Sequence, residues 1–75
     1  MLIKLGKQAG MSRIVNGISF SDIDDCIKKG VKNEEGGDVV SSYGGLKINF
    51  NIQNNVYMVK RLIKKWYVHF VKGML

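Results

Sequence analysis

Apolar residues recur every three or four positions from Phe20 to Ile27, which is the spacing of a helix that buries one face. Ser19 has the position of an N-cap, and Asp22 stands three residues further on, as in a capping box. Gly30 follows two lysines, where a helix commonly ends. The sequence therefore predicts a helix between Ser19 and Gly30.

A period of two replaces this pattern in the middle of the chain. From Leu46 to Ile52, apolar residues alternate with polar ones, as in a strand with one buried face. Val39 to Tyr43 is a second strand-like run, and Gly44-Gly45 between the two suits a tight hairpin turn. We predict an antiparallel β-hairpin over residues 39–52. The polar residues 31–38 are expected to form a loop.

Near the C-terminus, apolar residues return to steps of three and four. We predict a basic amphipathic helix from about Asn55 to Lys72, stopped by Gly73. The alternative is a hairpin turn at Asn54-Asn55 that joins strands over residues 56–63 and 66–71. The helix is favoured because a strand would place Lys60 and Lys64 on the same face as Leu62 and Trp66.

Together these elements predict one small α+β domain over residues 1–75. Its N-terminal helices are short, one of them covering residues 2–9 and ending at Gly10, and its long C-terminal helix covers the central hairpin. A chain of 75 residues is too short for two cores. Because the core is so small, we also expect a homodimer through an exposed apolar strip. The predicted core residues are Ile18, Phe20, Ile23, Ile27, Ile48, Phe50, Ile52, Val59, Leu62, Ile63, Trp66 and Phe70.

The composition excludes several classes of protein. The single cysteine, Cys26, cannot close an internal disulfide, which favours a reducing cytoplasm. One Cys and one His, His69, cannot supply the four ligands of a structural zinc site. No catalytic constellation or cofactor motif occurs, so we expect a non-enzymatic protein without metal or cofactor. No uncharged run approaches the roughly 18 apolar residues of a membrane span.

The charges are distributed unevenly. Twelve Lys and Arg residues against six Asp and Glu give a formal net charge of +6. All six acids lie between Asp22 and Asp38, so the basic residues after position 38 are without an acid in their own segment. Such a basic surface suits the phosphates of DNA or RNA. The residues predicted to contact nucleic acid are Lys47, Asn49, Lys60, Arg61, Lys64, Lys65 and Lys72.

A solvated lysine face that only keeps the protein in solution is the plain alternative to this nucleic-acid interface. A second alternative is an anionic membrane surface, because residues 56–75 combine basic residues with Trp66, Tyr67 and Phe70. Here Glu34-Glu35-Gly36-Gly37, followed by a cationic segment, resembles the cleavage site of bacteriocin precursors cut after a double glycine.

A ribonuclease is the enzymatic alternative. The run from Asn16 to Ile23, followed by Ile27, Gly30 and then strands, resembles the helix-to-strand passage of small RelE-like toxin nucleases. The resemblance implies a toxin that cleaves RNA. No catalytic residue is transferred, because only Arg13 stands where such families often carry His and Arg. The interpretation that we favour is a small non-enzymatic nucleic-acid-binding protein of a bacterium or a mobile element.

Overall fold

The computed structural model describes residues 2–65, which form a small α+β domain of five strands and two helices. In chain order these are β1 (Leu2–Leu5), α1 (Lys7–Val15), α2 (Phe20–Lys29), β2 (Val31–Glu35), β3 (Asp38–Tyr43), β4 (Leu46–Gln53) and β5 (Val56–Lys64).

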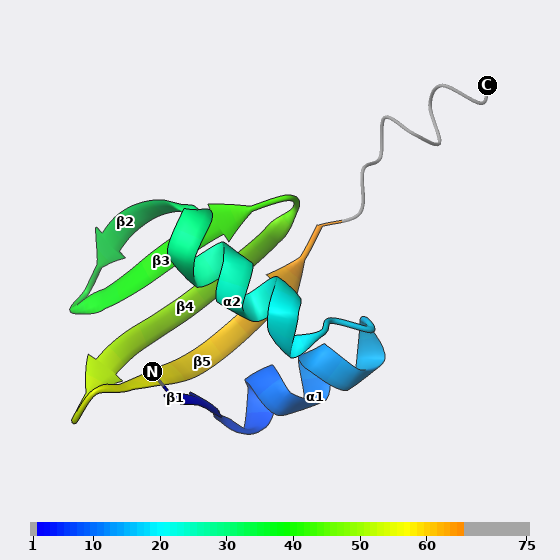
Figure 1. Cartoon of the computed structure of the whole chain (residues 1–75), viewed down its shortest axis with the longest axis horizontal. Helices are drawn as coiled ribbons and strands as arrows, with labels where there is room; N and C mark the ends of the chain where they lie inside the picture. The colour runs from blue at the N-terminus through cyan, green and yellow to red at the C-terminus, as the bar shows by residue number, and fades with distance from the viewer. Residues whose placement is uncertain (1, 66–75) are drawn as a thin grey trace.

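All five strands belong to one sheet, in the order β1-β5-β4-β3-β2. Strands β2 to β5 form an antiparallel meander, whereas β1 pairs with β5 in parallel. Both helices lie on the same side of the sheet: α2 crosses β3 and β4, and α1 lies along β5 (Figure 1). Within residues 2–65, the opposite side of the sheet carries no helix, and we call it the helix-free face.

The turns of the meander explain why it forms. Each turn has two residues with positive φ, as in the mirror-image turns that match strand twist: Gly36-Gly37, Gly44-Gly45 and Asn54-Asn55. Glycine adopts positive φ without a steric penalty, and asparagine tolerates it better than most residues. The hairpin predicted over residues 39–52 is confirmed, and the turn at Asn54-Asn55 is the one named by the alternative to the C-terminal helix.

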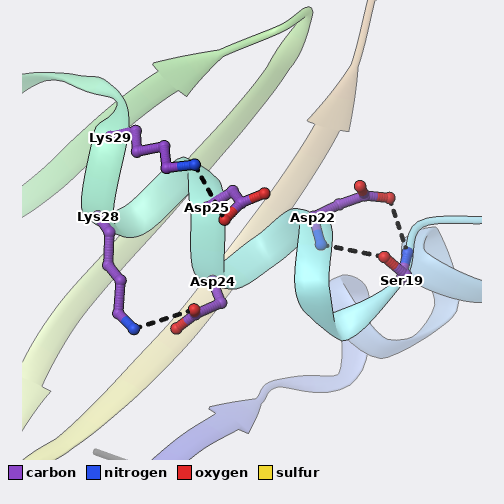
Figure 2. A network of polar contacts seen from close by, with 6 residues as sticks. All are labelled: Ser19, Asp22, Asp24, Asp25, Lys28 and Lys29. Atoms are coloured by element: carbon purple, nitrogen blue, oxygen red, sulfur yellow. Dashed lines mark hydrogen bonds and ion pairs between the residues drawn. The ribbon is translucent and has the colours of Figure 1, made fainter.

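Helix α2 begins and ends as the sequence predicts. The Asp22 backbone N–H donates to the Ser19 hydroxyl at 3.0 Å, and the Ser19 backbone N–H donates to the Asp22 carboxylate at 3.1 Å (Figure 2). This capping box satisfies two backbone donors that the helix itself leaves unpaired. Hydrogen bonds from the Ser19 backbone and hydroxyl also hold the pKa of Asp22 below its ordinary value. Two ion pairs, Lys28–Asp24 at 3.1 Å and Lys29–Asp25 at 3.7 Å, lie further along the exposed side (Figure 2).

Helix α2 packs closely on β3. The Ser41 hydroxyl donates to the Cys26 carbonyl at 2.5 Å, and the Cys26 thiol donates back to the Ser41 carbonyl at 3.3 Å. A Cβ atom at Gly30 would collide with the Ser41 Oγ and the Cys26 carbonyl oxygen. Only glycine at position 30 therefore allows this close approach of helix to strand.

The core lies between the helices and the sheet. Seven predicted core residues are buried there: Ile18, Ile23, Ile27, Ile48, Phe50, Val59 and Leu62. The prediction is wrong for Phe20, Ile52 and Ile63, whose exposed fractions are 51%, 54% and 41%. Trp66 and Phe70 lie outside the described residues.

The predicted fold layout is wrong at three places. Residues 2–5 form a strand, and the first helix starts at Lys7 and continues past Gly10 to Val15. The expected loop over residues 31–38 contains β2. Most importantly, residues 56–64 form β5, not the first half of a C-terminal helix. The remainder of that predicted helix, up to Lys72, lies outside the described residues.

A β-bulge explains the wrong helix prediction. Partners of β4 and β5 run in register from Leu46–Lys64 to Asn49–Arg61, but Phe50 then faces Val59, so Lys60 is the extra residue. The bulge separates the buried residues Val59 and Leu62 by three positions. A regular strand would separate them by two, and this step of three imitated the period of a helix.

Strand β1 and helix α1 attach to β5 over a long sequence separation. Leu2 to Leu5 pair with Val56 to Val59, and the Gly6 backbone N–H donates to the Val59 carbonyl at 2.8 Å. The Ser12 hydroxyl donates to the Leu62 carbonyl at 2.8 Å, and the Leu62 N–H donates to the Gln8 side-chain oxygen at 3.2 Å. These bonds fix α1 against the far end of the chain that the structure describes.

Candidate functional site

The helix-free face carries most of the polar side chains of the sheet. Successive residues of a strand point to opposite sides of the sheet. Buried Ile48 and Phe50 and their partners on β3 point toward the helices, so the residues next to them in each strand point to the helix-free face. The register therefore aligns Asn33, Val40, Asn49 and Arg61 across β2, β3, β4 and β5 on the helix-free face. Lys47 and Ile63 form the next pair toward the β3–β4 turn.

The bulge increases the basic character of this face. It lets two consecutive residues, Lys60 and Arg61, project from the same side of β5, while Val59 and Leu62 both remain in the core. Lys60 contacts Asp38, which lies in line with Asn51 on the helix-free face, and Arg61 is paired with Asn49 there. Strict alternation would have turned Lys60 toward the helices. This expected position of Lys60 was part of the argument for a helix over residues 56–64.

Lys47, Asn49 and Arg61 surround a hollow in this face. Glu35, Val40 and Ile63 complete its lining. Val40 forms the floor. It is only 5% exposed although no helix of residues 2–65 covers it, and longer side chains surround it. Lys47 and Arg61 make no ion pair with a carboxylate of the described residues. The hollow therefore combines two cationic groups and one carboxylate, that of Glu35, around an apolar floor.

Lys60, unlike these two cations, is already neutralised within the protein. Its ammonium lies 3.1 Å from the Asp38 carboxylate, and the Asn51 amide donates to the same carboxylate at 3.1 Å. The Asn51 amide, followed by the Lys60 ammonium, holds the pKa of Asp38 below its ordinary value. Asp38 thus links Asn51 and Lys60 in one polar network on the helix-free face.

Two buried oxygen atoms of this face have no hydrogen-bond partner within residues 2–65. They are the Oδ1 atoms of Asn49 and Asn51. A buried acceptor without a donor costs about 1–3 kcal/mol, so a sequence selected only for stability would not retain it. Asn51 has a role in the fold because its amide donates to Asp38, so it is the polar character of Asn49 that needs an explanation other than folding within the described residues.

The structure does not bring all the predicted contact residues together. Lys47, Asn49 and Arg61 line one hollow, whereas Lys60 lines a different one, together with Lys4 and Asn51. Lys64 lies on the other side of the sheet, near Asp22 and Asp25 of α2, and donates to the Gly44 carbonyl at 3.4 Å.

Lys65 follows β5 and lines a different hollow, together with Ser42 and Lys47. Lys72 lies outside the described residues. Sequence reasoning missed Glu35 because residues 31–38 were expected to form a loop. It missed Val40 because no apolar residue two positions before or after it marks its face of the strand.

Other kinds of site are not seen in the part of the chain that the structure describes. Residues 2–65 contain no group of three or more side chains that could hold a metal ion. The Cys26 thiol is buried, and burial raises its pKa, so it packs as a protonated core side chain. None of the helices within this range is long and apolar enough to cross a membrane.

The chain was compared with protein families, curated proteins and solved structures. None of the three comparisons found a match.

Proposed function

We propose that the protein binds nucleic acid, with the helix-free face of the sheet against the phosphate backbone. The observation that carries this proposal is the convergence of Lys47 and Arg61 beside Asn49 around one hollow. Neither cation makes an ion pair with a carboxylate of the described residues, including that of Glu35 in the same lining. Lysine and arginine recognise phosphate by charge and by N–H donors, and asparagine adds a neutral amide that can reach a phosphate or a base edge.

The positions of the aromatic side chains support contact with the nucleic-acid backbone over base stacking as the proposed mode. Tyr57 lies on the helix side of the sheet, where its ring meets that of Phe50 edge-on at 5.5 Å between centroids. Tyr43 is the partner of buried Leu46 and therefore also projects toward the helix side. The helix-free face of the described sheet thus offers no aromatic platform for unpaired bases. The proposed mode is contact with phosphates, which is insensitive to sequence and sensitive to salt.

Titration of labelled DNA and RNA duplexes and single strands at increasing salt tests the proposal. The key variant is the double substitution Lys47→Gln with Arg61→Gln. Its matched control is Lys28→Gln with Lys29→Gln, which removes the same charge from the exposed side of α2. We expect the first variant to bind weakly and to lower the salt slope by about 2, since each phosphate contact contributes about 0.9 to that slope. The control should keep the native slope.

Two results would contradict the proposal. One is the absence of binding by the native protein at low salt. The other is an equal loss of binding in both double variants, which would assign binding to net charge and not to the helix-free face.

The cytoplasm, inferred from the single Cys26, remains the compartment that we propose for this activity.

The same titration separates the alternatives drawn from the sequence. Cleavage of the RNA during incubation would favour the RelE-like ribonuclease. Binding to anionic liposomes, with no binding to DNA or RNA, would favour a membrane surface as the partner. The helix that was to provide this membrane contact is absent over residues 56–64, where the chain forms β5.

A further inference from the structure

Strand β2 forms one edge of the sheet, and all five of its residues are exposed. Its inner side pairs with β3, so its outer backbone N–H and C=O groups face away from the described sheet. An edge of this kind is a template for another strand. The side chains of β2 determine which strand can pair with it.

The charges of β2 favour a second copy of β2 in one register only. In an antiparallel pair centred on Asn33, Lys32 of each copy lies opposite Glu34 of the other, which gives two opposite-charge pairs. A register centred on Lys32 places the two lysines opposite each other. A register centred on Glu34 does the same for the two glutamates. These neighbouring registers are therefore repulsive, and the side-chain order specifies the attractive one.

The side chains that would meet lie on one side of the sheet. Lys32 is the β3 partner of Ser41 and Glu34 is the partner of Val39, and both of these face the helices. The Lys32 ammonium donates to the Gly30 carbonyl at 3.1 Å, which holds the side chain at the start of β2. An ammonium has three donors, so this bond leaves two for a carboxylate across the edge.

The opposite edge of the sheet does not offer such a match. Strand β1 carries Lys4 as its one charged residue, so no antiparallel register of two β1 strands gives an opposite-charge pair. Natural proteins often protect an edge by placing lysine where a second copy would meet lysine. In β2 the neutral Asn33 is central instead, with opposite charges on either side.

We propose that two copies of the protein pair through β2, antiparallel and centred on Asn33, to form a two-fold symmetric dimer with one continuous ten-stranded sheet. A two-fold axis through this contact, perpendicular to the sheet, keeps the helices of both copies on one side. The two helix-free faces then form a single surface with two copies of the hollow around Val40. The dimer does not depend on what this surface binds.

The test measures mass against concentration on the full chain, by sedimentation between about 1 μM and 1 mM, the range expected for a small interface. The variants are Lys32→Glu and Glu34→Lys. Each replaces both attractive pairs with two repulsive ones, so each alone should raise the dimer dissociation constant by at least about 10-fold. Lys29→Glu is the matched control for the charge change, and it should dimerise as the native protein does.

Mixing the two variants provides the decisive measurement. One carries glutamate at both positions and the other lysine at both, so the mixture should form a heterodimer although each variant alone is monomeric. A native protein that stays monomeric up to about 1 mM overturns the proposal. A mixture that remains monomeric overturns it as well. So does a dimer that tolerates both single substitutions, because such a dimer would form through another surface.

Discussion

Replacing Asn49 with valine should make the protein more stable. The Oδ1 atom of Asn49 is buried without a hydrogen-bond partner in the described residues, beside the apolar floor formed by Val40. Removing an unsatisfied buried acceptor recovers about 1–3 kcal/mol. Valine also has the higher strand propensity, on a scale that spans about 1 kcal/mol. The expected gain in the free energy of unfolding is therefore about 1–3 kcal/mol, and the melting temperature rises by about 4–8 °C for each kcal/mol.

Asn33→Val is the matched control for Asn49→Val. Asn33 faces the same Val40 from β2, but it is exposed, so its substitution changes propensity without relieving a buried acceptor. Urea unfolding followed by circular dichroism, at one protein concentration, gives both free energies. The reasoning is refuted if Asn49→Val is not more stabilising than Asn33→Val. If Asn49 serves the proposed binding, its substitution also weakens nucleic-acid binding while the protein becomes more stable.

Three further predictions concern the fold. The Asn51 amide lowers the pKa of Asp38 in the folded state. The stability that this carboxylate provides is therefore present above about pH 4 and is lost as the pH falls through the folded-state pKa. In an acid titration between pH 7 and 2, Asp38→Asn should lose less stability than the native protein. Ser19→Ala removes one half of the capping box and should lower the free energy of unfolding by about 1 kcal/mol in urea. Gly30→Ala should destabilise the protein by about 1–3 kcal/mol, because its Cβ meets the Cys26 carbonyl. Gly10→Ala in α1 has open space around it and should stabilise the protein by about 0.5–1 kcal/mol. Thermal melts measure both, and equal signs for the two variants would contradict the packing argument.

The parts of the fold that were predicted correctly are those defined by neighbouring residues. Helix α2 has its cap, its apolar stripe and its terminal glycine within a dozen positions. The cap acts through local hydrogen bonds, and the apolar stripe marks the buried face without reference to a particular partner. The hairpin of β3 and β4 is equally local, because Gly44-Gly45 sets the turn and Leu46, Ile48 and Phe50 set the buried face.

The parts that were predicted wrongly depend on distant partners. Leu2 to Leu5 are a strand only because β5 lies beside them, and four residues cannot indicate such a partner. The bulge at Lys60 depends on the pairing of β5 with β4, and it changed the apparent period of β5.

The candidate site was predicted in part for the same reason. The alternation of β4 identified Lys47 and Asn49 as residues of one face, while the position of Arg61 beside them required the register across two strands.

The attachment of β1 to β5 has a consequence for the order in which the chain folds. The β2–β5 meander consists of consecutive hairpins, each of which closes a short loop. Residues 2–15, by contrast, find their sheet partners only beyond position 55, so they must remain unpaired until nearly all of the described chain has been synthesised. Strand β5 is thus the strand that carries Arg61 and also the one that must be complete before the beginning of the chain can dock.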